Sequence, residues 1–424
     1  MALSHGRRHF AIVAWLVFLV SLLKGLRMPS SWSATHMTFN YSHGFIRRGL
    51  VGEVIRLVSG ARPYSYNRLA LLAILFFVAV AVVMVLLVKR VLDTDPEDVG
   101  LKAVVLAFAA SPGVVMLANA IGYLDYVGLL LVVSVILISA RSERRYLIFF
   151  LGIPVGVMLA FIHEAQTLMF APTILFAMIC HIVIQFRRGD ISHRAKFLLV
   201  ANAALGFIAA FGTSAAVGIV GTKSPDAIST LQASVGQVAN FRLRSDAFAT
   251  LSRPVSEAVF KLMPSFWRDP GNRAYLVLSM ISAFPAIAFV IFYGMRLIGR
   301  LDLSKLTRVI VAACFIAATL APVGLNLIGW DSARWNAISL VACFCCVAIL
   351  RLYFSSNVCA EPSLRVESPL TLTLAAVAIV LGLCSSNYTN FLFDGHSVQG
   401  YPFEEPVKSF IDLVKGHFTF MPRD

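Results

Sequence analysis

The chain of 424 residues is 58% hydrophobic and only 14% charged, with a mean hydropathy of +0.81. A soluble domain of this composition would expose large apolar patches, so we exclude a soluble globular protein and predict an integral membrane protein. The net charge of +14 does not indicate nucleic-acid binding, because no nucleic-acid-binding motif accompanies it. Basic loops beside anionic lipid headgroups account for this charge.

The apolar runs predict eleven transmembrane helices, since a helix needs about 20 apolar residues to cross a bilayer. Three runs are much longer than that, and one polar turn interrupts each of them. Each therefore predicts two helices joined by a tight turn, with the turns at 119–126, 163–166 and 329–336. Single spans are predicted over 10–27, 69–88, 197–221, 274–295 and 370–385. No small-residue cleavage site follows the first span, which predicts a retained helix rather than a signal peptide.

Four short connections are rich in Lys and Arg, at 89–90, 141–145, 186–190 and 295–308. The positive-inside rule places them in the cytoplasm together with the N-terminus. The C-terminus, the three turns and three longer segments then lie outside, the segments being 28–67, 222–272 and 386–424. Basic residues in the first outer segment weaken this asymmetry. We expect a single transmembrane domain over 1–424, in the inner membrane of a bacterium.

Two outer segments contain patterns typical of helices that lie on the membrane surface. In 45–58, Ile46, Leu50, Val54 and Leu57 recur at helical spacing. The segment 256–267 is apolar and aromatic, with basic residues beside it.

Five of the seven cysteines lie inside apolar runs and the long outer loops contain none, which argues against a disulfide framework. We interpret Cys343, Cys345 and Cys346 as core residues. The spacing of Cys343, Cys345 and Cys346 is not that of zinc ligands. We expect no disulfide framework, no metal and no cofactor.

Polar side chains gather at the turns and in the first outer loop. They are Asn119, Asp125, His163, Glu164, Asp331 and Arg334 at the turns, and His43, Arg47, Arg48 and Glu53 in the loop. Ionisable groups at membrane depth are costly, so they usually pair or line a watery cavity. The cytoplasmic halves of the same helices hold almost none, which predicts a cavity that opens outward.

Simpler roles are open for each element. Asp125 has the position of a helix N-cap, and the His163–Glu164 turn can simply reach water. Asp331 and Arg334 have the i, i+3 spacing of a salt bridge.

Arg47 and Arg48 would need no ligand if they formed a solvated basic face. However, Gly44, Gly49 and Gly52 surround them, and glycine lets backbone approach a ligand closely. The planar guanidinium group also matches the geometry of phosphate. We therefore interpret the pair as a clamp for an anionic headgroup.

A basic clamp beside outward carboxylates suits enzymes that use polyprenyl-phosphate-linked sugars. The arginines would stabilise the phosphate leaving group, and a carboxylate would accept the proton of the acceptor hydroxyl. No Gly-rich phosphate loop or dinucleotide fingerprint is present, so no nucleotide is expected.

The many spans, the outward polar turns and a first outer loop with a surface helix resemble the GT-C-type glycosyltransferases and surface-polysaccharide polymerases of bacteria. The resemblance covers most of the chain as architecture. It implies polysaccharide biosynthesis at the cell envelope, with a polyprenyl-phosphate-linked sugar and membrane lipids as partners. GT-C enzymes place an acidic catalytic residue early in this loop, whereas residues 28–52 contain none.

The catalytic candidates are Glu53, Asp125 and Glu164, and we favour Glu164 because His163 can modulate it. The substrate-binding candidates are His43, Arg47, Arg48, Asn119, Asp331 and Arg334. Two alternatives from other classes stay open. One is a transporter or flippase of a lipid-linked or anionic substrate, with spans kinked at prolines. The other is a membrane acyltransferase with His163 as general base.

Overall fold

The computed structural model describes residues 2–60, 64–141, 144–188, 192–257, 260–261, 263–329, 331–354 and 369–394. Every regular element within these ranges is a helix. Together with the apolar length of these helices, this confirms the predicted all-α polytopic membrane protein.

In the part of the chain that the structure describes, eleven apolar helical stretches coincide with the eleven predicted spans. Seven are long enough to cross a membrane: α4 (Tyr66–Leu92), α5 with α6 (Val99–Ala110, Pro112–Asn119), α9 (Glu164–Arg188), α10 (His193–Val220), α15 (Pro270–Arg300), α16 with η4 (Lys305–Leu320, Ala321–Leu327) and α17 (Ser332–Phe354). Four contain shorter apolar stretches: α1 (Ala2–Gly25), α7 (Asp125–Ser139), α8 (Leu147–Ile162) and α18 (Pro369–Asp394).

One predicted proline kink is a true break. The Ser111 side chain accepts a hydrogen bond from the Gly113 N–H and so caps α6, whose first residue is Pro112. Proline suits this position because a first-turn residue has no intrahelical partner for an N–H. By contrast, Pro154 and Pro172 lie inside α8 and α9, which continue past them.

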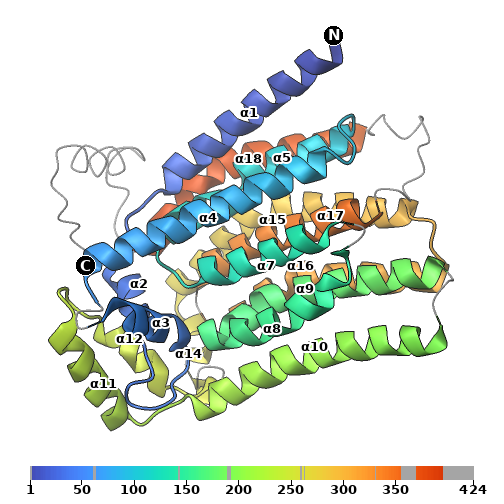
Figure 1. The fold of residues 1–424 in the computed structure, drawn as a ribbon. Coiled ribbons are helices and arrows are strands. Elements are labelled where there is room, and N and C mark those ends of the chain that lie inside the picture. Colours follow the sequence, from blue (N-terminus) through green and yellow to red (C-terminus); the bar gives the residue numbers. More distant parts are fainter. Residues whose placement is uncertain are drawn as a thin grey trace.

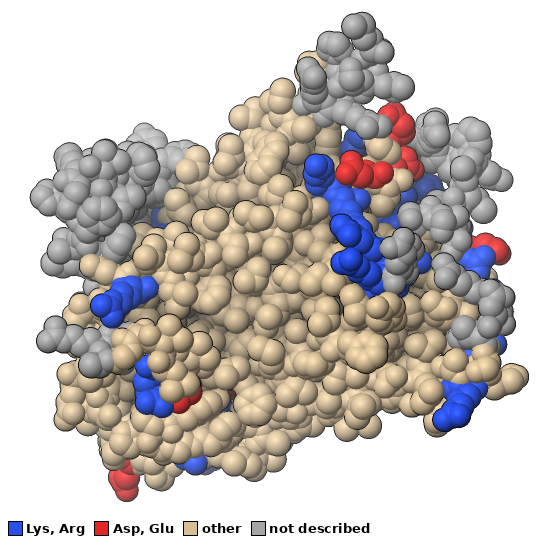
Figure 2. All heavy atoms as spheres, viewed as in Figure 1, with Lys and Arg blue, Asp and Glu red and all other residues tan. Residues whose placement is uncertain are grey.

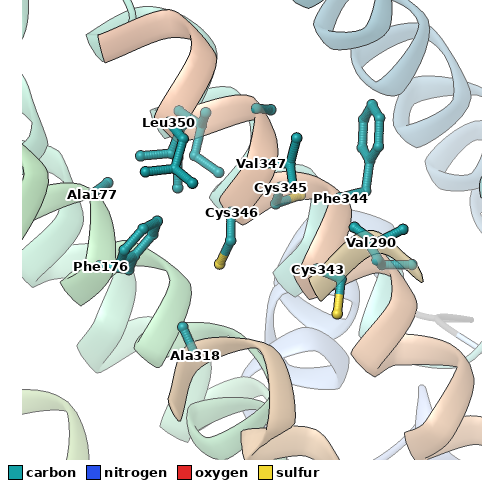
Figure 3. Close-up of a cluster of buried hydrophobic side chains, with 14 of the residues drawn as sticks. Phe176, Ala177, Val290, Ala318, Cys343, Phe344, Cys345, Cys346, Val347 and Leu350 are labelled. Atoms are coloured by element: carbon teal, nitrogen blue, oxygen red, sulfur yellow. The ribbon is translucent and has the colours of Figure 1, made fainter. Parts of the chain in front are cut away.

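Helix α17 lies at the centre of the bundle and is buried along its whole described length. It packs against α15, α9, α16 and α6. Figure 3 shows Cys343, Cys345 and Cys346 on this helix among apolar side chains of its neighbours, including Phe176 and Ala318. The predicted core role is confirmed for these three cysteines. Cys180 is buried as well, whereas Cys314 is half-buried, Cys359 lies outside the described residues and the side chain of Cys384 is not described.

The two ends of the bundle differ. The start of α1 and the basic connections lie at one end, which we call the basic end (Figure 1). The opposite end carries α2 (Ser31–His36), α3 (Leu50–Ser59), α11 (Pro225–Val238), α12 (Ser245–Ala249) and η2 (Thr250–Ser252), which we call the cap layer. Between the ends, Figure 2 shows a band of surface without charged side chains. This arrangement is typical of a protein whose middle lies in lipid.

The cap layer joins two of the predicted outer segments, a contact that the sequence did not predict. Its helices share an apolar core that packs on the tips of α4, α7 and α8. Backbone contacts support the joint: the Asn240 N–H donates to the Tyr64 carbonyl at 3.2 Å, and the Arg244 N–H donates to Thr35 Oγ1 at 3.1 Å. Helices α2 and α3 of the first segment therefore build one layer with α11, α12 and η2 of the second.

The predicted surface helices are only partly found. α3 begins inside 45–58 and ends one residue beyond it, at Ser59, but its apolar residues face two ways, with Ile55 buried and Leu57 67% exposed. The segment 256–267 contains α13 (Val255–Glu257) and α14 (Met263–Arg268) rather than one described helix, with residues 258, 259 and 262 outside the described residues. Most of the predicted segment 386–424, from residue 395 onward, also lies outside them.

Candidate functional site

The charged residues predicted at the turns gather beneath the cap layer in two groups. The glutamate cluster consists of Arg47, Arg48 and Glu164, and it joins the first outer loop to the turn before α9. The aspartate cluster consists of Asp125, Asp331 and Arg334, and it joins the first and third hairpins.

Arg48 and Glu164 form the closest pair of the glutamate cluster. Arg48 Nε donates to both carboxylate oxygens at 3.1 and 3.0 Å, and Nη2 donates to Oε1 at 2.5 Å. Arg47 Nη1 lies 3.6 Å from Oε1. The Arg48 and Glu164 side chains are 13% and 14% exposed, so the pair is accessible from outside the protein.

The backbone of Arg48 explains how neighbouring arginines reach one carboxylate. Its φ of 63° lies in the left-handed region, which costs a non-glycine residue on the order of 1 kcal/mol. In an extended segment adjacent side chains would point to opposite sides. The left-handed turn instead brings both guanidinium groups towards Glu164.

One of the nearby glycines has a packing role. A Cβ on Gly52 would lie 2.0 Å from the Phe39 carbonyl oxygen, so glycine lets α3 approach the segment after α2. This close approach is to protein backbone and not to the ligand that we predicted. Gly44 adopts a φ of 95°, which glycine permits.

The two arginines of the predicted clamp differ in their partners. Arg47 is buried, and its Nη2 donates to the carbonyls of Thr250 and Arg253. Its N–H donates to the Gly221 carbonyl at 3.2 Å. Burial lowers the pKa of Arg47 to about 10, so the group stays charged at neutral pH. Arg47 thus ties the loop to η2 and to the end of α10, whereas Arg48 is the more accessible cation.

His163 ends α8 in an extended conformation, and its Nδ1 accepts the Ala165 N–H at 3.1 Å. The hydrogen-bond pattern therefore assigns the ring proton to Nε2. Burial, and then the charge of Arg48, hold the pKa of His163 well below its usual value. The ring is neutral, and its contact of 3.7 Å with Glu164 is not an ion pair.

The aspartate cluster centres on Arg334. Its Nε lies 2.7 Å from Asp125 Oδ2, and its Nη1 donates to Asp331 Oδ2 at 2.6 Å. The Arg334 and Asp125 side chains are 4% and 8% exposed, against 30% for Asp331. The expected salt bridge between Asp331 and Arg334 is present and has a third, buried partner. The N-cap role for Asp125 is wrong, because Leu124 is the N-cap of α7 and Asp125 pairs across to α17.

Aromatic side chains extend from the aspartate cluster to His36. The Arg334 guanidinium lies 5.0 Å from the centre of the Tyr123 ring, which lies 5.4 Å from the Trp32 ring. Trp32 packs on His36 at 3.8 Å. Burial, and then Arg48, lower the pKa of His36. Sequence reasoning missed Trp32 and His36, whose i, i+4 spacing was the only available signal.

Apart from His163, three predicted residues lie outside both clusters. Glu53 pairs with Arg56 at 2.6 Å and accepts the Tyr41 N–H at 3.0 Å. The hydrogen bond from Arg56 is the main cause of its lowered pKa. His43 is exposed, and Asn119 is the half-buried last residue of α6. Glu53 therefore stabilises the start of α3, away from Glu164.

The basic end holds a third buried group that we did not predict. Tyr293 donates its hydroxyl proton to Asp98 Oδ2 at 2.9 Å, and Arg351 contacts both residues. The expectation that this half of the helices is nearly free of ionisable groups is wrong here. Arg351 can be buried because the Asp98 carboxylate neutralises its charge and the Tyr293 hydroxyl accepts its hydrogen bonds.

The two clusters at the cap end have net formal charges of opposite sign. Two arginines and one glutamate leave the glutamate cluster at +1, since His163 is neutral. One arginine and two aspartates leave the aspartate cluster at −1. An anion is therefore attracted to the glutamate cluster. Within the described ranges, no three His, Cys, Asp or Glu side chains are placed to hold a metal ion.

Fold and site define a polytopic α-helical membrane protein with buried ion clusters at one end of the bundle. Residues 8–229, just over half of the chain, match the family described as uncharacterised membrane protein Rv1490, and the chain belongs to this family. No curated protein and no solved structure matches the chain. The family description supports a membrane protein and does not reach the GT-C class.

Proposed function

We propose that the protein transfers or polymerises sugars from a polyprenyl-phosphate-linked donor at the outer face of a bacterial inner membrane. One observation carries the proposal: the glutamate cluster keeps a net positive charge, accessible from outside, at the end of an apolar helical bundle. A lipid with an anionic headgroup has the matching charge and the matching solubility.

The contacts suggest how the cluster would work. A phosphate oxygen takes the place of the Glu164 carboxylate on Arg48, which frees the carboxylate. The acceptor oxygen attacks the anomeric carbon while the bond from that carbon to the phosphate oxygen breaks. The acceptor proton passes to Glu164, and polyprenyl phosphate leaves with its charge stabilised by Arg48 and Arg47. Asp331, the most exposed member of the aspartate cluster, would bind a sugar hydroxyl.

A transporter or flippase is the second candidate, and the basic end favours it. Arg334 and Arg351 lie 17 residues apart on α17, a rise of about 26 Å, and each pairs with an aspartate of another helix. Buried ion pairs at both ends of one helix suit a protein that closes alternately on two sides. An acyltransferase has less support, because His163 Nδ1 already accepts a backbone N–H.

The test compares surface glycans and lipid-linked sugars in cells that contain the wild type, no protein, R48Q, E164Q or R56Q. R56Q is the matched control, since Arg56 lies in the same segment but pairs with Glu53 outside the cluster. Amounts of each variant in the membrane are measured in parallel.

Transfer or polymerisation predicts that R48Q and E164Q lose a glycan and accumulate its precursor on the outer leaflet, while R56Q behaves as the wild type. Precursor held on the inner leaflet would instead identify a flippase. Unchanged glycans in every strain would refute both candidates.

A further inference from the structure

A strip of α9 stays half-buried along most of the helix. The residues of this strip recur every three or four positions, which places them on one face. They are Ala165, Leu168, Pro172, Leu175, Ile179 and Ile182. The rest of the helix is almost entirely buried between Gln166 and Ile184. The strip therefore faces away from the core and is entirely apolar.

Two helices flank this strip. On one side Phe176 of α9 packs on Phe315 of α16, with ring centres 5.8 Å apart. On the other side Met178 of α9 lies against Gly206 of α10. At helical spacing, Phe176 and Met178 fall on opposite edges of the strip. Helices α10 and α16 both pack on α9 and thus flank the strip, and we call the surface of the strip between these two helices the groove.

The groove ends at the glutamate cluster. Glu164 is half-buried and directly precedes Ala165, the first residue of the strip. Ser214 of α10 donates to the Glu164 carbonyl at 3.1 Å. The aspartate cluster has no comparable surface, because its central Arg334 lies on the fully buried α17. Of the two clusters at this end, the positively charged one borders the groove.

The dimensions fit a long hydrocarbon chain. From Ala165 to Ile182 the helix rises about 26 Å, close to the roughly 30 Å of a bilayer core. We propose that this groove holds the hydrocarbon chain of an anionic lipid whose phosphate binds Arg48. The inference deepens the proposed function by assigning the path of the lipid, and it rests on that function for the lipid's identity.

The headgroup decides the specificity of this site. Bilayer lipid is as apolar as the groove, so the hydrocarbon chain gains little free energy by moving from the bilayer into the groove. The contact between the phosphate and Arg48 must therefore hold the lipid in place. Loss of Arg48 should therefore remove the lipid chain from the groove as effectively as a bulky side chain that fills the groove.

The test uses the full-length protein in nanodiscs and a polyprenyl phosphate that carries a photoactivatable diazirine in its chain. Labelled residues are mapped by mass spectrometry. We expect labelling concentrated on the α9 strip and the facing sides of α10 and α16, with competition by unlabelled polyprenyl phosphate. L175W and I179W, which fill the groove at two depths, should each remove this enrichment, and so should R48Q. L75W is the matched control, because Leu75 lies on the exposed face of α4.

Even labelling of all exposed helices, or enrichment that survives both groove variants, would overturn the proposal. Crosslinks from the groove to a second copy of the chain would overturn it as well. The probe carries no sugar, so a failure of the proposed sugar transfer would leave this labelling unchanged. Conversely, an unlabelled groove would leave the glycan comparison intact.

Discussion

Replacing Asp125 with Asn tests the energetics of the aspartate cluster, because Arg334 has two carboxylate partners of very different burial. Asp125 is 8% exposed and Asp331 is 30% exposed, with closest contacts of 2.7 and 2.6 Å to the same guanidinium. Removing one partner of a buried pair typically costs 3–5 kcal/mol. We expect D125N to lower the free energy of unfolding by about 3 kcal/mol, the low end of that range, since Asp331 still pairs with Arg334.

D331N is the matched control, and a more exposed pair contributes at most about 1 kcal/mol. The double variant D125L/R334M removes both buried charges and should cost less than D125N alone. Reversible unfolding in mixed micelles measures all three variants. Equal losses for D125N and D331N, or a double variant that is the least stable, would refute the reasoning from burial.

The contacts at the cap end predict how pH and substitutions change the stability of the protein. Burial and Arg48 lower the pKa of His36 and His163, while the unfolded chain takes up these protons near pH 6.5. As the pH is lowered from about 6.5, the free energy of unfolding should therefore decrease by up to roughly 1.4 kcal/mol per pH unit for each histidine. A melting temperature that stays constant from pH 7.5 to 5 would contradict this. G52A should destabilise the cap layer by about 1–3 kcal/mol, because the added methyl group meets a backbone carbonyl. Faster cleavage of the cap layer in limited proteolysis would show this loss. R47Q should lower the melting temperature more than R48Q, since only Arg47 satisfies two carbonyls of the cap layer; the reverse order would refute the division of roles.

The spans were predictable because the bilayer imposes a simple rule on length and polarity. A run about twice the required length, broken by a single polar turn, predicts two helices joined by that turn, as at His163 and Glu164. The Asp331–Arg334 bridge was also predictable, since i, i+3 spacing is local. The break at Ser111 was readable from the Ser-Pro pair itself.

The contacts between hairpins were not predictable, because they depend on how distant segments pack. Nothing near Asp125 in the sequence indicates that its partner is Arg334, 209 positions away. The different roles of Arg47 and Arg48 depend on the carbonyls of Thr250 in η2 and of Arg253 just after it, which lie about 200 positions further along the chain. The positive φ of Arg48 has no sequence signal, since that conformation is rare for arginine.

The anion site at the glutamate cluster is tested by the binding of polyprenyl phosphate to the wild type, R48Q and R56Q in nanodiscs. A lost charge-assisted contact is worth about 1.5–3 kcal/mol, which corresponds to a Kd weakened about tenfold or more. We expect this loss for R48Q and no change for R56Q, because Arg56 pairs with Glu53 instead. Equal binding by R48Q and the wild type would contradict the assignment of the glutamate cluster as the anion site.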